Sequence, residues 1–235
     1  MQVVILAGGL ATRLRPVTET IPKAMVPIEG RPFLEYQIDF LKKNGVTDLV
    51  LCVGYLSEKI EQYFANGHEF GVTIQYVHDG DRLLGTAGAL KRAESLLQEN
   101  FFVMYGDSYL FLNFKDVYST FKKSNKSAVM VVYKNDNNYD TSNVAIENGK
   151  VIRYDKKNLI GDLVYIDYGV LVFAKSILDL IPGDQVCQLE NVIHDLIQKK
   201  DLVAYEATKR FYEIGSHKGL EDFTRYIRDQ KKTGV

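Results

Sequence analysis

The sequence contains few cysteines, no excess of charge of one sign and no long apolar run. Cys52 and Cys187 are far apart and show no metal-ligand spacing, so we expect buried, reduced thiols in a cytoplasmic protein rather than a disulfide. The 29 basic and 30 acidic residues give a formal net charge of -1, so no overall field attracts nucleic acid or an anionic membrane. No segment approaches the roughly 20 apolar residues of a membrane span, and we interpret the first apolar run as a core strand rather than a secretory leader.

Short apolar runs alternate with helical patterns in the first part of the chain. With 235 residues, 46% of them hydrophobic, the chain is long enough for one α/β domain with a small added lobe. The runs are typical of strands covered on both faces and lie at 2–6, 48–53, 73–77 and 101–105. The predicted helices occupy 32–44, 57–64 and 88–98. This order predicts a doubly wound, mostly parallel sheet that binds ligands at the carboxyl ends of its strands.

The pattern changes after residue 107, where strand signals become more frequent. Asn148-Gly149 is typical of a tight hairpin turn. The predicted elements are strands at 144–146, 151–154 and 164–173, helical stretches near 178 and at 189–199, a strand near 203 and a helix from about 218. We predict a single domain, 1–235, in which a β-rich half, 111–235, lies against the first half, 1–110, as a substrate-binding lobe.

A glycine-rich turn follows the first strand. Gly8 and Gly9 let the backbone turn sharply and approach a ligand closely, with amide N–H groups exposed to phosphate oxygens. Arg13 and Lys23 add cations, which suit the negative charges of a nucleoside triphosphate. A tight turn beside surface charges is the alternative interpretation. The segment has no G-x-x-x-x-G-K-[ST] and no G-x-G-x-x-G with an acidic partner, which argues against a Walker ATPase or a nicotinamide enzyme.

Residues 6–23, L-A-G-G-L-A-T-R-L-R-P-V-T-E-T-I-P-K, resemble the signature of the sugar-1-phosphate nucleotidyltransferases. That signature usually reads L-A-G-G-x-G-T-R-L-x-P-x-T-x-x-x-P-K-P, so Ala11 and Ala24 stand where glycine and proline are usual. Because a Cβ disfavours left-handed backbone, Ala11 predicts a negative φ at that position. The resemblance covers the whole chain, more loosely after residue 110. It implies a Rossmann-like fold in which the first half binds the nucleotide.

The resemblance also implies an activity: an enzyme that condenses a nucleoside triphosphate with a sugar 1-phosphate and releases pyrophosphate. It assigns nucleotide binding to Leu6, Ala7, Gly8, Gly9, Thr12, Arg13, Lys23, Gly85 and Thr86. It assigns catalysis to Arg13, Lys23 and Asp107. The loop L-G-T-A-G-A-L at 84–90 is most similar to that of guanylyltransferases for mannose or heptose 1-phosphates, which weakly favours GTP.

Two carboxylates are candidate ligands of Mg²⁺. Asp107 follows a predicted strand and Gly106, so its carboxylate is well placed to hold the ion against a triphosphate. The same strand-Gly-Asp setting carries a metal-binding Asp in the family that the chain resembles. Glu213 lies in F-Y-E-I-G-S, which resembles the family segment W-x-D-I-G-T and its second metal ligand.

The resemblance places the acceptor in the second half. Asp155 and Lys156 match a Glu-Lys pair that contacts the hydroxyls and the phosphate of the sugar, and Tyr168-Gly169 resembles a family strand entry against which the sugar lies. The expected substrate-binding set is Asp107, Asn143, Asp155, Lys156, Tyr168 and Gly169.

Other functions stay open. The same chemistry could use CTP or UTP with another phosphorylated acceptor, or the chain could be a catalytically silent subunit that senses nucleotide sugars, although retention of the charged residues disfavours that role. A glycosyltransferase normally carries Asp-x-Asp after its fourth strand, and residues 107–109 read Asp-Ser-Tyr. Whether the chain forms a homo-oligomer stays open as well.

Overall fold

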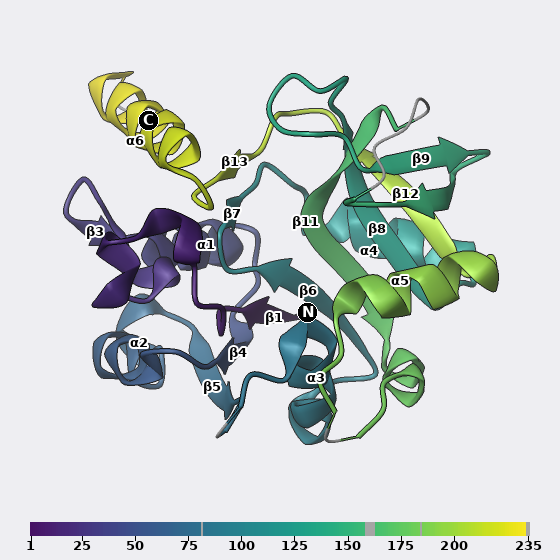
Figure 1. Ribbon diagram of the computed structural model, residues 1–235, viewed down its shortest axis with the longest axis horizontal. Coiled ribbons are helices and arrows are strands. Elements are labelled where there is room, and N and C mark those ends of the chain that lie inside the picture. Colours follow the sequence, from purple (N-terminus) through teal and green to yellow (C-terminus); the bar gives the residue numbers. More distant parts are fainter. Residues whose placement is uncertain (81, 158–162, 184, 234–235) are drawn as a thin grey trace.

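The computed structural model describes residues 1–80, 82–157, 163–183 and 185–233 (Figure 1). In this part of the chain a nine-stranded sheet has the order β5-β4-β1-β6-β11-β8-β12-β10-β9. None of the described helices contains a stretch that is long and apolar enough to cross a membrane.

The first half of the sheet is parallel. Its strands are β1 (Gln2–Leu6), β4 (Asp48–Val53), β5 (Thr73–His78) and β6 (Asn100–Tyr105). Strand β1 pairs in parallel with β4 on one side and with β6 on the other, and β4 pairs in parallel with β5. The chain therefore reverses its direction of winding at β1. The crevice at the carboxyl ends of β1 and β6 is where a doubly wound sheet binds its ligands.

The second half makes the sheet mixed. Its strands are β8 (Ala128–Lys134), β9 (Val144–Glu147), β10 (Lys150–Tyr154), β11 (Tyr165–Ala174) and β12 (Leu202–Ala207). Strand β11 is antiparallel to both β6 and β8, and β10 is antiparallel to β9 and β12, whereas β12 is parallel to β8. The prediction of a mostly parallel sheet thus holds for the first half but not for the whole. A strand that is buried on both faces has the same apolar composition whether it runs parallel or antiparallel to its neighbour. Composition therefore could not distinguish a parallel from a mixed sheet.

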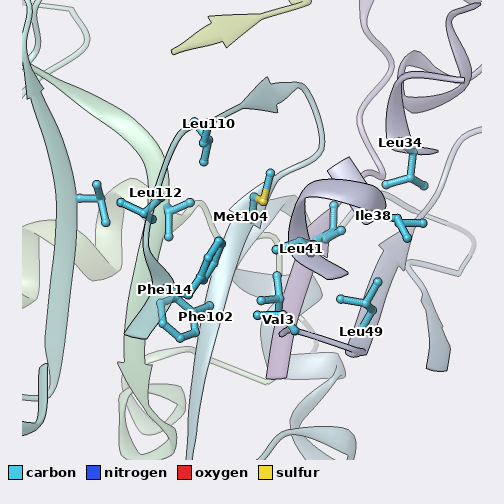
Figure 2. Packing of buried hydrophobic residues seen from close by; sticks show 14 of the residues in the cluster. Val3, Leu34, Ile38, Leu41, Leu49, Phe102, Met104, Leu110, Leu112 and Phe114 are labelled. Atoms are coloured by element: carbon cyan, nitrogen blue, oxygen red, sulfur yellow. The ribbon is translucent and has the colours of Figure 1, made fainter. Parts of the chain in front are cut away.

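Helices cover both faces of the sheet. They are α1 (Phe33–Lys43), α2 (Ser57–Phe64), α3 (Gly85–Arg92), α4 (Phe114–Ser124), α5 (Leu189–Gln198) and α6 (His217–Thr233). Strand β1 shows how the two layers are separated: Val3 and Ile5 belong to the cluster that contains α1, α2 and α4, whereas Val4 belongs to the cluster that contains α3 and α5. Figure 2 shows the first cluster, in which Leu34 and Ile38 of α1 lie over β1 and β4. Alternating side chains of one strand therefore serve two cores.

Short 3-10 helices and strands connect the sheet and its helices to the crevice. They are the 3-10 helices η1 (Thr12–Leu14), η2 (Val17–Glu19), η3 (Lys23–Met25), η4 (His68–Phe70), η5 (Glu94–Leu96) and η6 (Lys175–Leu180), and the strands β2 (Pro27–Ile28), β3 (Arg31–Pro32), β7 (Ser108–Tyr109) and β13 (Tyr212–Glu213). The antiparallel pair β7–β13 joins Ser108 to Glu213, so the end of the chain returns to the carboxyl end of β6. Helix α6 follows β13 and fixes its position against α1. Phe223 of α6 packs edge-on against Phe33 of α1, with ring centroids 5.2 Å apart.

Candidate active site

The glycine-rich turn is held against the carboxyl ends of β1 and β4. The N–H of Ala7 donates to the carbonyl of Cys52 at 2.8 Å, and the N–H of Gly106 donates to the carbonyl of Leu6 at 3.0 Å. A Cβ added to Gly8 would lie 3.2 Å from Oδ2 of Asp79, and one added to Gly106 would lie 2.9 Å from the carbonyl oxygen of Leu6. The absence of side chains at these glycines therefore lets three strand ends meet closely.

The backbone of Ala11 differs from the prediction. Its φ is 48° and its ψ is 44°, which is the left-handed region, whereas the sequence predicted a negative φ. Two hydrogen bonds hold this conformation: the hydroxyl of buried Thr18 donates to the Ala11 carbonyl at 2.8 Å, and the N–H of Leu14 donates to the same oxygen at 3.1 Å. The alanine methyl thus occupies a position at which glycine would be unstrained.

Charged side chains from distant segments come together in one cluster. The ammonium of Lys23 lies 2.6 Å from Oδ2 of Asp107, and both side chains are partly exposed. Nη2 of Arg13 and Nζ of Lys23 lie 3.3 and 3.4 Å from the point that a Cβ on Gly215 would occupy, and the Glu213 carboxylate adjoins the same point. Arg13, Lys23, Asp107 and Glu213 therefore form one cluster of charged side chains.

Glu213 and Asp107 are neighbours through the pairing of β13 with β7. The N–H of Ile214 donates to the carbonyl of Asp107 at 2.9 Å. The Glu213 carboxylate accepts a hydrogen bond from the hydroxyl of Ser216 at 2.9 Å and another from the N–H of Gly215. These contacts orient the carboxylate at the end of the loop.

The donor set of this cluster fits Mg²⁺. Carboxylate oxygens are the ligands that this ion prefers, and Mg²⁺ usually takes one or two of them together with substrate phosphates. Within the ranges that the structure describes, no group of three or more His, Cys, Asp or Glu side chains could hold a metal ion by itself. Asp107 and Glu213 are the carboxylates of this cluster that could hold such an ion together with substrate phosphates.

A cavity of about 400 Å³ lies at the carboxyl ends of β1 and β6. Many of the predicted residues line it, namely Leu6, Ala7, Gly8, Gly9, Lys23, Gly85, Thr86 and Asp107. Thr12 and Arg13 are not among the described residues in its lining, although Arg13 adjoins Lys23. The cavity therefore runs from the first turn of α3 to Lys23 and Asp107 of the charged cluster.

The structure adds wall residues that the sequence did not suggest. These are Cys52, Asp79, Leu83, Val186 and Gln188. Burial raises the pKa of the Cys52 thiol to about 12, so this thiol stays uncharged at neutral pH. The segment before α5 reaches the cavity because the N–H groups of Ala87 and Gly88 donate to the carbonyl of Cys187 at 3.0 and 3.2 Å. No local signal in the sequence links this segment to the nucleotide loop, which lies some hundred residues earlier.

The predicted acceptor residues lie beside the same edge of the sheet. Nζ of Lys156 is 5.6 Å from the ring centroid of Tyr105 at the end of β6. The N–H of Asp155 donates to the carbonyl of Asn143 at 2.9 Å, and the side chain of Asn143 accepts from the N–H of Asp167 at 2.9 Å. Asn143, Asp155 and Lys156 are thus brought together.

Asp167 belongs to this group, although the sequence did not single it out. Its carboxylate accepts from the hydroxyl of Tyr154 at 3.1 Å and from the N–H of Gly169 at 2.9 Å. Burial raises the pKa of the Asp167 carboxyl, and the Lys156 ammonium opposes this shift. The alternation of side chains along a strand could have suggested that position 167, rather than 168, faces Lys156.

Tyr168 points to the opposite side of β11. Its side chain is buried with the α1 and α4 cluster, and its hydroxyl donates to the carbonyl of Lys209 at 2.9 Å and accepts from the N–H of Phe111 at 3.2 Å. Gly169 has a φ of +88°, and a Cβ there would lie 2.8 Å from Oγ of Ser108. Any contact of Tyr168 with a substrate would therefore come from its main chain.

Comparison with known proteins identifies the family. Residues 2–230 match the family model described as Nucleotidyl transferase, so the chain belongs to the nucleotidyl transferase family. It is 31% identical over 219 residues to the D-glycero-alpha-D-manno-heptose 1-phosphate guanylyltransferase of Campylobacter jejuni, with 92% of this chain and 95% of that protein covered.

Two further similarities show how the family varies. The chain is 29% identical over 244 residues to the UTP--glucose-1-phosphate uridylyltransferase of Synechocystis, with 97% of this chain and 63% of that protein covered. The chain thus spans a little under two thirds of the length of this relative. The inositol-1-phosphate CTP transferase from T. maritima superposes with a TM-score of 0.82 at 25% identity, with 100% of this chain and 97% of that chain covered.

Proposed function

We propose that the chain is a magnesium-dependent nucleotidyltransferase that joins a nucleoside triphosphate to a sugar 1-phosphate and releases pyrophosphate. The observation that carries this proposal is the cluster of Arg13, Lys23 and Asp107, of which Lys23 and Asp107 line a cavity of about 400 Å³. Membership of the nucleotidyl transferase family supports it. We also propose a cytoplasmic location, in keeping with the unpaired, buried cysteines.

The reaction requires alignment and charge compensation rather than a general base. A phosphate monoester with a second pKa of about 6 is largely a dianion at neutral pH. An oxygen of the sugar phosphate attacks the α-phosphorus and forms a new P–O bond. The bond from the α-phosphorus to the bridging oxygen of the β-phosphate breaks, and pyrophosphate leaves with that electron pair. Arg13 and Lys23 offset the charge of the triphosphate while this exchange takes place.

Asp107 and Glu213 are the residues that would hold Mg²⁺. The bound ion supplies additional positive charge beside the phosphate oxygens. The ion pair of Asp107 with Lys23 implies that the ammonium exchanges this carboxylate for a phosphate oxygen when substrate binds.

The acceptor is proposed to lie against Lys156 and Asp155. The ammonium of Lys156 suits the phosphate of the sugar, and the carboxylate of Asp155 suits its hydroxyl groups. Asn143, Gly169 and the main chain of Tyr168 complete the proposed acceptor wall. Similarity to the heptose 1-phosphate guanylyltransferase supports GTP and a sugar 1-phosphate as the substrates.

A second candidate keeps the chemistry and changes the substrates. Similarity to an inositol-1-phosphate CTP transferase over the whole chain favours CTP with a phosphorylated alcohol as the alternative pair. Product masses distinguish the two candidates, because each nucleotide sugar or nucleotide alcohol has its own mass.

The proposal is tested by measuring pyrophosphate release from a panel of triphosphates and phosphorylated acceptors in the presence of Mg²⁺. Release should require one triphosphate, one acceptor and the metal together. A protein that binds nucleotide but releases no pyrophosphate with any pair would instead be a silent sensing subunit, and the proposed activity would be wrong.

A further inference from the structure

The buried face of α1 contains one amide side chain among apolar and aromatic ones. Gln37 is fully buried, and the other buried residues of this helix are Phe33, Leu34, Tyr36, Ile38 and Leu41. The Nε2 group of Gln37 donates to the carbonyl of Tyr105 at 3.0 Å and to the carbonyl of Ser108 at 2.7 Å. One amide thus joins α1 to both sides of the turn that carries Asp107.

The two carbonyls fix the orientation of the Gln37 amide. An amide oxygen in the place of Nε2 would face two acceptors, so the nitrogen must face the turn. Among the residues that the structure describes, Oε1 of Gln37 is the only buried side-chain nitrogen or oxygen atom without a hydrogen-bond partner. A buried polar atom without a partner costs free energy. The contribution of this amide therefore lies in its contacts with the turn and not in the core around α1.

Ser108 connects the Gln37 amide to both carboxylates of the charged cluster. Its carbonyl accepts from Gln37, its hydroxyl donates to Oδ1 of Asp107 at 3.3 Å, and its place in β7 pairs with Glu213 of β13. The carbonyl of Asp107 in turn accepts from the N–H of Ile214 at 2.9 Å. A displacement of Ser108 would therefore displace both Asp107 and the strand that carries Glu213.

The position of these carboxylates matters because of the ion that they are proposed to hold. Mg²⁺ demands near-ideal octahedral geometry, with oxygen ligands at about 2.0–2.1 Å. A ligand that moves by more than about 0.5 Å leaves the productive geometry. Loss of a group that orients a metal ligand commonly weakens metal binding by about tenfold to a hundredfold.

We propose that Gln37 is a positioning residue for the metal site, because it holds the turn of Asp107 and, through β7 and β13, the strand of Glu213. This inference rests on the proposed nucleotidyltransferase function and adds a residue to its metal-dependent binding of nucleotide. Gln37 is fully buried and is not among the described residues in the cavity lining, so it acts only through these two carboxylates.

The experiment measures equilibrium dissociation constants of GTP, CTP and UTP by calorimetry, once with Mg²⁺ and once with EDTA. No acceptor is present, so no turnover occurs. For the unmodified protein we expect at least one nucleotide to bind more tightly with Mg²⁺ than with EDTA. The difference between the two conditions reports how much the metal strengthens binding, separately from binding by the glycine-rich turn.

Two variants remove the contact in different ways. Gln37→Met keeps the length of the side chain and removes both donors, whereas Gln37→Asn keeps the amide but withdraws it by one methylene from the carbonyls. We expect both variants to raise the dissociation constant with Mg²⁺ by about tenfold or more and to leave the constant with EDTA unaltered.

Tyr36→Phe is the matched control. The hydroxyl of Tyr36 donates from the same helix to the carbonyl of Ile28 at 2.9 Å, away from the turn of Asp107. This variant also loses a buried hydrogen bond from α1 to the main chain, and it should leave both constants unaltered.

Thermal unfolding separates positioning from stability. Gln37→Asn loses buried volume that Gln37→Met retains, so we expect the Asn variant to have the lower Tm, although both should lose the effect of the metal equally. A purely structural role would instead make the loss of metal-dependent binding follow the loss in Tm, and the same loss would appear in Tyr36→Phe.

Unchanged binding with Mg²⁺ in both Gln37 variants, or a loss that follows Tm, would overturn the inference and leave the proposed function intact. Failure of both variants to fold would also overturn it, because Gln37 would then serve stability. Absence of binding for all three nucleotides, or equal binding with Mg²⁺ and with EDTA in the unmodified protein, would overturn the proposed magnesium-dependent function and the inference with it.

Discussion

The ammonium of Lys23 lies 2.6 Å from Oδ2 of Asp107, although the two residues are 84 positions apart in the chain. Lys23 begins the 3-10 helix η3, and Asp107 follows the carboxyl end of β6. The contact joins the segment after the glycine-rich turn to the switch point of the sheet. A bound magnesium nucleotide could replace both partners of this ion pair. A phosphate oxygen would take the place of the Asp107 carboxylate beside Lys23, and the metal would take the place of the Lys23 ammonium beside Asp107.

Removal of either charge should reduce turnover more than stability. We expect Lys23→Ala and Asp107→Asn each to lower kcat by about a hundredfold or more, because groups that stabilise transferring phosphates contribute at this level. Initial rates of pyrophosphate release at saturating substrate measure the effect. Lys43→Ala, at the exposed end of α1, is the charge-matched control and should retain full activity. Full activity of both site variants would refute the assigned roles.

Ala11→Gly should stabilise the protein. Alanine at a φ of 48° is strained, and glycine adopts this backbone freely, although it also gains freedom in the unfolded chain. We expect a net gain of about 1 kcal/mol, which corresponds to an increase in Tm of about 2–4 °C for a chain of this size. Ala24→Gly removes a methyl that is buried in the core, and this control should lower Tm. A lower Tm for Ala11→Gly, measured by calorimetry, would mean that the methyl contributes more by packing than the strain costs.

Asp79→Asn should alter how stability depends on pH. Burial raises the pKa of the Asp79 carboxyl in the folded protein above its unfolded value, and the Leu84 N–H and Arg92 only partly offset this shift. The ionised group therefore destabilises the fold at pH values above the folded pKa, and this penalty disappears as the pH falls below the unfolded pKa. We expect the variant to be the more stable protein at pH 7, with the difference shrinking toward pH 4. Urea unfolding at several pH values tests this, and a constant difference would contradict it.

Phe223→Ala should loosen the return of the chain to the site. The ring is fully buried between Phe33 and Tyr36 of α1, at centroid distances of 5.2 and 5.8 Å. Truncation should destabilise the protein by about 3–5 kcal/mol. We also expect a loss of activity at temperatures at which the protein stays folded, because the neighbouring strand carries Glu213. Phe223→Leu should lose less stability and less activity than Phe223→Ala. Equal activity of the unmodified protein and both variants would show that packing of α6 does not support the site.

Features that depend on neighbours in sequence were predictable. The strands of the first half were located to within one residue, because buried runs of β-branched and aromatic residues mark them locally. The glycine-rich turn and its cations lie within one continuous segment, which also carried the resemblance to the family. Helix α4 and strand β8 were not predicted, although α4 has a regular amphipathic pattern and β8 a run of valines.

Features that depend on distant partners required the tertiary structure. Strand direction in the second half follows from how β11 pairs with β6 and β8, and a buried strand has the same composition in either orientation. The left-handed backbone of Ala11 depends on hydrogen bonds from Thr18 and Leu14. Asp79 and Gln188 enter the cavity wall only because the ends of strands and a distant loop meet there. Local composition records propensity and burial, whereas the cavity is made by contacts between segments far apart in the chain, and the free energy of those contacts has no signature in any single segment.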